Sequence, residues 1–359
     1  MRRVWMVGCC LAWGAVAQTI SFEEYTPKST LVVPQNPRTR AKFPFVDLHG
    51  HPRQMGSPEK IGQLISEMDA MNMRTMVNLD GRSGDALKRT LENMRGKYPG
   101  RFVVFANIDF KGIDDPKWTA KTVAQLEQDI KNGASGLKIY KNLGMDVKDS
   151  SGQRVKVDDP RIDPVWALCG KLKVPVMIHT ADPAPFWLPQ DKFNERWLEL
   201  KEMPGRVRSG EKYAPFETII AEQHRMFKKN PGTTFVNAHL GWYGNNLGEL
   251  GRLMDEMPNM YTEIGAVLAE LGRQPRFARQ WFMRYQNRVL FGKDTYTPSE
   301  YPTYFRVLES ADEYFDYYRR RHAFWQMYGL DLPDEVLKKL YYKNAARIIP
   351  GIDLKSFPQ

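Results

Sequence analysis

The chain has 359 residues, 42% of them apolar and 26% charged, so it is long enough to bury a large core and too apolar to be disordered. Its formal net charge of +10 at pH 7 favours anionic ligands, but the basic residues are scattered and no nucleic-acid motif is present, so we expect no nucleic-acid partner. One basic run, YYRRRH at 317–322, is interpreted as a solvated helix face.

The first residues have the pattern of a cleaved signal peptide. Arg2 and Arg3 precede an apolar stretch that begins at Val4, and the small residues AVA come before Gln18. The apolar stretch is shorter than the roughly 20 residues that a spanning helix needs, so we expect no membrane span. We therefore assign 1–17 to a signal peptide and expect an exported, periplasmic protein.

The cysteines agree with this assignment. Cys9 and Cys10 leave with the signal peptide, although a lipid anchor on one of them is the weaker alternative. Cys169 then remains alone, so we expect no internal disulfide and interpret this residue as a small buried hydrophobe.

Beyond the signal peptide, 18–42 is predicted to be an extended, proline-containing lead-in, and 43–350 to be a single catalytic domain. Eight short apolar runs in this domain predict parallel strands that are covered on both faces. They are FPFVDLH from Phe43, RTMVNL from Arg74, RFVVFANI from Arg101, GLKIY from Gly136, VPVMIH from Val174, TTFVNAH from Thr233, NMYTEIG from Asn259 and RVLFG from Arg288.

Amphipathic segments that predict helices fill the gaps between these runs. They cover 58–71, 84–97, 119–132, 245–256 and 274–285, and a further helix is predicted within APFETIIAEQHRMFKKNPG, from Ala214, before it stops at Asn230. Eight strands that alternate with helices predict an α/β fold, a closed (β/α)8 TIM barrel, with an open doubly wound sheet as the alternative.

Two segments are longer than barrel connections usually are. The loop at 181–213, after the fifth strand, is long enough to be functional, for example as a lid. The aromatic segment at 295–345 is predicted to form a helical C-terminal extension, with a homodimer contact as one hypothesis for its aromatic residues.

Four of the six histidines end predicted strands. His49 and His51 alternate at the end of the first strand, so their side chains project to one side and can converge on one ion. His179 ends the fifth strand, His239 ends the sixth, and Asp294 follows the eighth. Because the C-terminal ends of barrel strands meet at one mouth, we expect these five side chains to gather there.

Three other polar residues have structural explanations. His224, within a helix, and His322 are interpreted as ordinary surface or packing residues. Asp47 shares a strand face with His49, and it is either a carboxylate that orients a ligand or a buried structural group.

The chain resembles the amidohydrolase superfamily, in the amidohydrolase-related branch that includes hydrolases and nonoxidative decarboxylases. The resemblance covers Phe43 to about Ile348 and rests on DLHGH, GLKIYK, MIHT, NAHLG, FGKD and KNAARI, which occur in family order. It implies a distorted (β/α)8 barrel that holds a divalent metal, and we expect one Zn²⁺.

The resemblance also implies roles for the five residues. His49, His51 and His179 would be metal ligands, Asp294 a ligand or water-orienting carboxylate, and His239 the general acid/base. Three neutral imidazoles and one carboxylate leave the ion a positive charge and an open position, which can lower the pKa of bound water to about 7. Asp294 can then accept a proton while His239 protonates the leaving group.

Four further residues are candidates to bind substrate. Lys138 ends the fourth strand, where binuclear superfamily members carry a carboxylated lysine between two metals. We favour one metal, with Lys138 as an anion-binding or polarising group. Arg53 and Arg82 are candidates to clamp a substrate carboxylate, with solvated arginines as the alternative. Trp187 could cover the substrate or pack within its own loop.

Three functions are compatible with the sequence. The first is an exported metal-dependent hydrolase that cleaves a small, anionic or neutral ester, lactone or amide. The second is a nonoxidative decarboxylase that uses the same metal site. The third is a noncatalytic protein that binds a metal or ligand, although a structural zinc site would be closed by four protein ligands.

Overall fold

The computed structural model describes residues 19–21, 24–52, 58–322 and 325–358. The chain divides into two units, Met1–Val33 and Pro34–Gln359. In the first unit, the described residues include no helix or strand. The predicted signal peptide and Arg53 lie outside the described residues.

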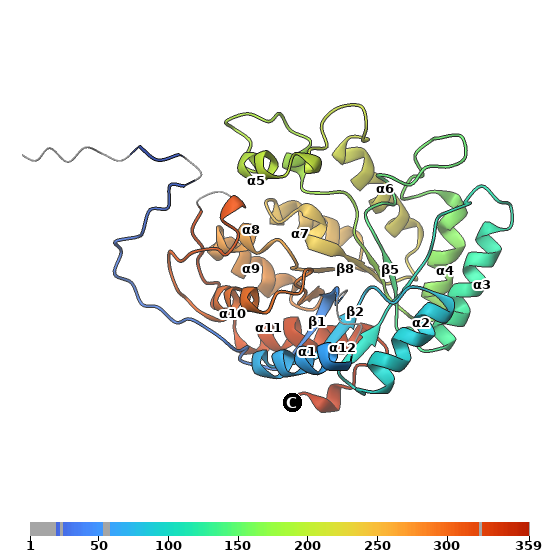
Figure 1. Ribbon diagram of the computed structural model, residues 1–359, viewed down its shortest axis with the longest axis horizontal. Helices are drawn as coiled ribbons and strands as arrows, with labels where there is room; N and C mark the ends of the chain where they lie inside the picture. Colours follow the sequence, from blue (N-terminus) through green and yellow to red (C-terminus); the bar gives the residue numbers. More distant parts are fainter. Residues whose placement is uncertain (1–18, 22–23, 53–57, 323–324, 359) are drawn as a thin grey trace, which may run out of the picture. The chain divides into compact units, whose positions relative to one another are not determined.

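The second unit is a (β/α)8 barrel whose strands occur at the predicted runs (Figure 1). Paired strands are parallel throughout the described residues. The strands are β1 (Phe45–Gly50), β2 (Met73–Asn78), β3 (Phe102–Val104), β4 (Ala106–Asn107), β5 (Leu137–Ile139), β6 (Val176–Ile178), β7 (Phe235–Asn237), β8 (Met260–Glu263) and β9 (Val289–Leu290).

The third predicted strand is interrupted at one residue, which is why nine strand labels describe eight barrel positions. Phe105 separates β3 from β4, and its amide donates to the Asn78 carbonyl of β2 at 2.9 Å. The next amide, of Ala106, donates to the Gly136 carbonyl beside β5 at 2.8 Å. β3 therefore pairs with β2, and β4 pairs with β5, while both remain in the barrel wall.

Hydrogen bonds from β1 to the end of β9 close the barrel. The Leu48 amide donates to the Phe291 carbonyl at 3.0 Å, and the Asp294 amide donates to the His49 carbonyl at 2.9 Å. Gly50 and Asp294 form a parallel bridge. The closed sheet, and not an open doubly wound one, brings the first and last strands together.

Helices cover the outside of the strands, and α1 to α4 lie along one side of the barrel in Figure 1. The longer helices match the predicted segments within two residues at most ends, although the segment predicted at 84–97 changes from α-helix to π-helix after Leu91. They are α1 (Pro58–Met71), α2 (Gly84–Leu91), α3 (Trp118–Lys131), α6 (Phe216–Lys229), α7 (Leu247–Glu256) and α9 (Pro275–Tyr285). The helix α4 (Asp163–Lys171) has no counterpart among the predicted segments.

Short helices build the two long segments. The loop at 181–213 contains α5 (Trp197–Glu202). Outside these two segments, the short helix α8 (Leu268–Gly272) follows β8. The C-terminal extension contains α10 (Tyr301–Glu309), α11 (Asp334–Lys338) and α12 (Asn344–Ile348). In the described part of the chain, no helix has both the length and the apolarity to cross a membrane.

The interpretation of 317–322 as a solvated helix face is wrong. His322 is buried, and its ring lies 2.9 Å from the guanidinium of Arg196. Arg196 is also buried and pairs with Glu199 at 2.8 Å and Glu270 at 2.7 Å. The end of the run therefore packs against a buried ionic cluster, and a charge count cannot reveal that partner.

Candidate metal centre

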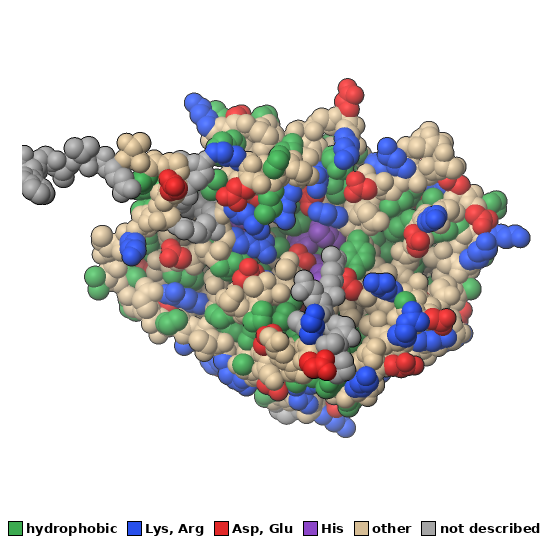
Figure 2. All heavy atoms as spheres, in the orientation of Figure 1, with side chains coloured by type: hydrophobic (Ala, Val, Ile, Leu, Met, Phe, Trp, Pro, Cys, Tyr) green, Lys and Arg blue, Asp and Glu red, His purple; other side chains and the backbone are tan. Residues whose placement is uncertain are grey.

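The first strand brings two histidines to the mouth of the barrel, as the sequence predicts. His49 is fully buried, and His51 follows the end of β1 with 11% of its side chain exposed. Their ring centroids lie 5.1 Å apart. Figure 2 shows histidine side chains in a hollow of this face, with basic and acidic side chains beside them.

Asp47 anchors this strand end through the backbone. Its carboxylate accepts from the amides of His49 at 2.9 Å and Lys293 at 3.2 Å, and from the Tyr301 hydroxyl at 2.6 Å. Burial raises the pKa of Asp47 to about 6, although these hydrogen bonds oppose the shift. These contacts support the structural interpretation of Asp47, because its partners are backbone amides and a phenol.

A carboxylate holds the Nδ1 atom of each histidine. His49 Nδ1 lies 3.0 Å from Glu263 Oε1, and His51 Nδ1 lies 3.0 Å from Asp80 Oδ1. The Tyr140 hydroxyl donates to the same Asp80 oxygen at 2.6 Å. A carboxylate that accepts a hydrogen bond from Nδ1–H keeps the proton on Nδ1 and leaves Nε2 with its lone pair, which is the form that binds a metal.

Both Nε2 atoms face one carboxylate. Asp294 Oδ1 lies 3.6 Å from His49 Nε2 and 3.7 Å from His51 Nε2. Tetrahedral ligands at about 2.1 Å from a zinc ion are about 3.4 Å apart, so the three atoms are spaced as ligands of one ion. These donors therefore fit a divalent metal, and all three are residues that the sequence predicts as ligands.

The protonation of these groups also suits a metal. Burial lowers the pKa of His49 well below its usual value, and the charge of Lys138 lowers it further. Burial opposes ionisation of Asp294, but the nearby His49, His239 and His51 outweigh it and hold the pKa of Asp294 at about 2. The shifts thus favour a neutral His49 imidazole and an ionised Asp294 carboxylate, the forms that bind metal.

Lys138 lies inside this cluster. It is buried on β5, and its Nζ lies 3.3 Å from His49 Nε2, the atom that also faces Asp294. The lysine is therefore placed where it can reach a substrate at the centre. Its role, as an anion-binding group or as a carboxylated bridge, stays a prediction.

His179 and His239 form a second pair on neighbouring strand ends. His239 Nε2 lies 3.4 Å from His179 Nδ1, and the His239 ring stacks on His49 with centroids 4.8 Å apart. Trp242 also stacks on the His239 ring, with centroids 4.6 Å apart, and its ring centroid lies 5.6 Å from that of His179. The four predicted histidines are thus contiguous.

The described residues give the two rings of this pair different partners. His239 Nδ1 lies 2.7 Å from the Gly265 carbonyl, so Nδ1 carries the proton and Nε2 is the acceptor. His179 Nε2 is buried and has no hydrogen-bond partner among the described residues. That atom is available as a ligand. Among the described residues, however, the two groups whose donor atoms lie close enough to share an ion do not include His179. One group is His49, His51 and Asp294, and the other is His49, His239 and Glu263.

His239 begins a turn of unusual backbone conformation. His239, Leu240 and Trp242 have φ values of 59°, 53° and 63°, in the left-handed region that costs a non-glycine residue roughly 1–2 kcal/mol. Glu263 supports the turn, because its carboxylate accepts from the His239 amide at 2.7 Å and the Gly265 amide at 2.5 Å. Strain of this kind gathers at functional sites, where the surrounding structure fixes it.

Sequence reasoning missed four residues of the centre. Glu263 ends β8 and Asp80 follows β2, so the strand-end rule that found the histidines also applied to these carboxylates. Tyr140 lies directly after β5, but a tyrosine there has no distinctive signal. Trp242 reaches the histidines only through the left-handed turn, which spacing does not predict.

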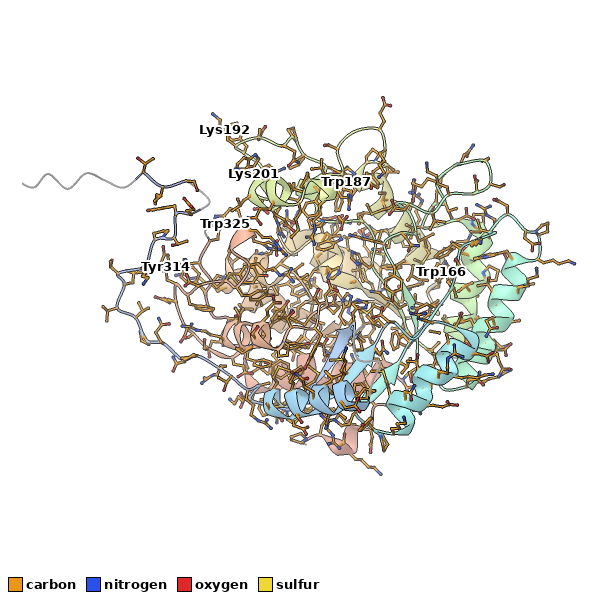
Figure 3. All side chains as sticks on the ribbon, viewed as in Figure 1. Trp166, Trp187, Lys192, Lys201, Tyr314 and Trp325 are labelled. Atoms are coloured by element: carbon orange, nitrogen blue, oxygen red, sulfur yellow. The ribbon has the colours of Figure 1, made fainter. Side chains whose placement is uncertain are left out.

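The remaining predicted residues lie outside the cluster. Arg82 lies beyond β2, exposed at the edge of a pocket beside Asp80. The Trp187 indole donates to the Ala214 carbonyl at 2.9 Å and packs against Phe216, and Figure 3 shows it in the segment that precedes α6. These contacts are those of a packing residue, and its role toward a substrate stays a prediction.

A family model described as amidohydrolase matches residues 40–351. None of the curated proteins compared with the chain matches it.

Several solved structures share the fold at low sequence identity. A 2,6-dihydroxybenzoate decarboxylase complexed with 2,6-dihydroxybenzoate is 16% identical, with a TM-score of 0.52, covering 85% of this chain and 98% of the other. The 4-oxalomesaconate hydratase of Rhodopseudomonas palustris is 15% identical, with a TM-score of 0.51 and coverages of 87% and 97%. A dihydroxybenzoic acid decarboxylase of Polaromonas sp. JS666, with bound manganese and the inhibitor 2-nitroresorcinol, is 15% identical, with a TM-score of 0.50 and coverages of 85% and 96%.

Proposed function

The chain belongs to the amidohydrolase family and is a metal-dependent enzyme of that family, and from this premise we propose that it hydrolyses a small ester, lactone or amide. One observation carries the proposal. His49 Nε2 and His51 Nε2 face Asp294 at ligand spacing, while carboxylates hold both Nδ1 atoms. Family membership sets aside the noncatalytic alternative.

We propose that His49, His51 and Asp294 hold one divalent ion, Zn²⁺, with His179 as a further ligand through its unpartnered Nε2. Such an ion would supply the positive charge that makes water nucleophilic near neutral pH. A second metal on a carboxylated Lys138 is the alternative. The manganese in one structural neighbour is a reason to measure the metal directly.

The residues around this position can move the protons that hydrolysis requires. Asp294 is ionised and can accept a proton from the attacking water. His239 holds its Nδ1 proton on Gly265, so its Nε2 can receive a proton and pass it to the leaving group. Lys138 can stabilise negative charge that develops on the substrate oxygen.

Nonoxidative decarboxylation is the second candidate. Two of the structural neighbours are decarboxylases of dihydroxybenzoates, and the Lys138 amine offers a positive charge inside the site. In this reaction His239 would take up a proton from solvent on Nε2 and donate it to the carbon that loses carbon dioxide, which restores the neutral ring. The same residues therefore serve both reactions, and the product separates them.

We further propose that the enzyme is exported to the periplasm after its signal peptide is cleaved, with lipid anchoring as the weaker alternative. The basic start, apolar stretch and AVA triplet support this proposal. Fractionation of cells that express the full chain would test it. Recovery of uncleaved protein from the cytoplasm would contradict it.

The reaction is tested by assaying metal-loaded protein against small esters, lactones and amides, and in parallel against dihydroxybenzoates. Hydrolysis releases acid without gas, whereas decarboxylation releases carbon dioxide. We expect acid release that disappears in Asp294→Ala. Carbon dioxide without hydrolysis would replace the first candidate by the second, and neither product from fully loaded protein would contradict both.

A further inference from the structure

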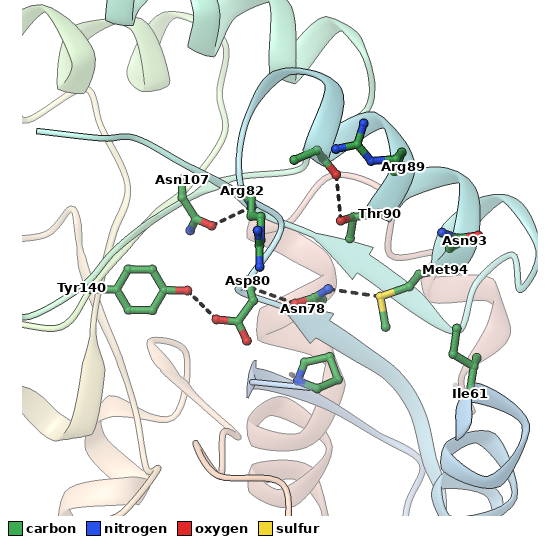
Figure 4. A pocket seen from close by; sticks show the side chains of 12 residues that line it. Ile61, Asn78, Asp80, Arg82, Arg89, Thr90, Asn93, Met94, Asn107 and Tyr140 are labelled. Carbon is green, nitrogen blue, oxygen red and sulfur yellow. Dashed lines mark hydrogen bonds between the residues drawn. The ribbon is translucent and has the colours of Figure 1, made fainter. Parts of the chain in front are cut away.

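A pocket of about 660 Å³ opens beside the metal centre, between β2, α1 and α2 (Figure 4). We call it the side pocket. Its volume lies in the range of about 300–1,000 Å³ that small-molecule sites occupy. It is lined by Pro52, Ile61, Asn78, Asp80, Arg82, Ala86, Arg89, Thr90, Asn93, Met94, Asn107 and Tyr140.

One end of the side pocket contacts the metal centre. Asp80 and Tyr140 line it, and the Asp80 oxygen that accepts from Tyr140 also holds His51 Nδ1. A molecule in the pocket therefore lies one residue away from a proposed ligand. This continuity makes the pocket an extension of the proposed active site.

Most of the neutral polar groups of the pocket already have partners. The Asn78 amide nitrogen contacts the Met94 sulfur at 3.1 Å, and the Thr90 hydroxyl donates to the Ala86 carbonyl at 3.0 Å. The Asn107 amide nitrogen donates to a carbonyl of the loop after β2 at 2.9 Å. These groups shape the pocket, while Ile61 and other apolar side chains supply its apolar surface.

The two arginines of the pocket differ from these groups. The side chains of Arg82 and Arg89 make no hydrogen bond or ion pair with a described residue, and both are exposed at the pocket edge. On the same helix, Lys88 pairs with Asp85 at 3.0 Å. Arg89 on α2 and Arg82 thus present positive charge at the pocket edge without a hydrogen bond or ion pair to a described residue, although Arg89, after Lys88, also helps to lower the pKa of the nearby Asp85.

The backbone fixes the position of Arg82. It has a φ of 65°, its amide donates to the Asn107 side-chain oxygen at 2.7 Å, and its carbonyl accepts from the Asn107 amide at 2.8 Å. A non-glycine residue in the left-handed region needs such support. The backbone from which the Arg82 side chain extends therefore has a fixed position on the pocket wall.

From these observations we propose that the side pocket binds an anionic group of the substrate, and that Arg82 and Arg89 determine this specificity. The ligand class is a small organic carboxylate with an apolar body, which lies over Ile61 while its reacting bond lies at the histidines. Guanidinium groups suit this role because they bind carboxylates with charge-assisted hydrogen bonds. This inference rests on the proposed function, since it assigns the substrate class of the same site.

The test compares two probes of the same shape, benzoate and neutral benzamide, on metal-loaded full-length protein by calorimetry. We expect benzoate to bind the wild type more tightly than benzamide, and Arg89→Gln to weaken benzoate about tenfold, the effect of one hydrogen bond to a charged group. Arg89→Glu should weaken it further. Benzamide binding should not change, and Lys88→Gln on the same helix should match the wild type.

Two results would overturn the side pocket as an anion site. One is equal benzoate affinity in wild type, Arg89→Gln and Arg89→Glu, with loss only in Asp294→Ala, which would place the carboxylate on the metal. The other is no benzoate binding to the wild type. Because binding is measured without turnover, arginine-dependent binding in a protein that releases neither acid nor carbon dioxide would instead reject the proposed reaction and keep the pocket.

Discussion

The two histidine pairs at the barrel mouth differ in what holds their rings. His49 and His51 each place Nδ1 on a carboxylate, of Glu263 and Asp80, so that both Nε2 atoms point to Asp294. The ring nitrogens of the second pair instead contact a backbone carbonyl at 2.7 Å and one another at 3.4 Å, with the Glu263 carboxylate farther away, 3.6 Å from His239 Nδ1.

The difference suggests a division of labour. Carboxylate partners fix the tautomer and raise the basicity of a ligand, which suits residues that hold a metal permanently. The Gly265 carbonyl fixes the tautomer of His239 and is closer to Nδ1 than the Glu263 carboxylate is, so Nε2 is left with its lone pair toward the site. Substitutions at each of the two histidine pairs test this difference.

The largest effect is expected for Asp294→Ala, because Asp294 contacts both ligand nitrogens of the first pair. We expect loss of bound metal and a fall in kcat/KM of at least about 10⁴-fold, the upper range of a general base. Elemental analysis and steady-state kinetics check both. A variant that keeps its metal and its activity would remove Asp294 from the centre.

His239→Asn should separate the second pair from the first. We expect kcat to fall about 10³-fold, within the range for a general acid or base, while the metal content stays that of the wild type. The control is His179→Ala, which should lower the metal content, because His179 is proposed as a further ligand. Loss of metal in His239→Asn would contradict the assignment of His239 as a proton carrier that does not bind the metal.

A smaller effect is expected for Asp80→Asn, which keeps the size of the group that holds His51. Loss of a carboxylate partner usually weakens metal affinity by about 10–100-fold, so activity should return at high metal concentration. Metal titration of the apoprotein measures this shift. An unchanged affinity would show that the carboxylate does not support His51 as a ligand.

The smallest effect on activity is expected for a histidine outside both pairs. His224 stacks on Tyr243, and burial lowers its pKa to about 4. We expect His224→Asn to keep metal content and kcat within about twofold, because it removes neither a ligand nor a proton carrier. A large loss of activity would mean that histidines matter to this fold irrespective of their place.

His224 should nevertheless affect stability. The unfolded chain, with a histidine pKa near 6.5, takes up the proton before the folded chain does as the pH falls. The free energy of unfolding should therefore decrease between about pH 6.5 and pH 4, by up to about 3 kcal/mol from this group. Denaturant unfolding at several pH values should show a smaller decrease in His224→Asn, and an equal decrease would reject the shifted pKa.

The fold was predictable because the barrel repeats one simple pattern. Continuous apolarity marked the buried strands, and α1 begins and ends at the predicted residues Pro58 and Met71. The break at Phe105 was not predictable, because a residue that bonds to the strand on one side has the same sequence signal as one that continues the strand.

The site was predictable only where residue type was rare. Histidines at strand ends are few, so His49, His51, His179 and His239 stood out, whereas the equally placed Glu263 did not, because a carboxylate at a strand end is common. Trp242 depends on tertiary strain that no local pattern encodes. Partners of charged residues, as for His322, are likewise set by segments distant in the chain.

The most direct test of the account is the position of the metal in crystals of metal-loaded protein, located by anomalous X-ray scattering. The account predicts a peak within about 2.0–2.2 Å of His49 Nε2, His51 Nε2 and an Asp294 oxygen. An active, metal-loaded enzyme whose ion contacts none of these three atoms would contradict it.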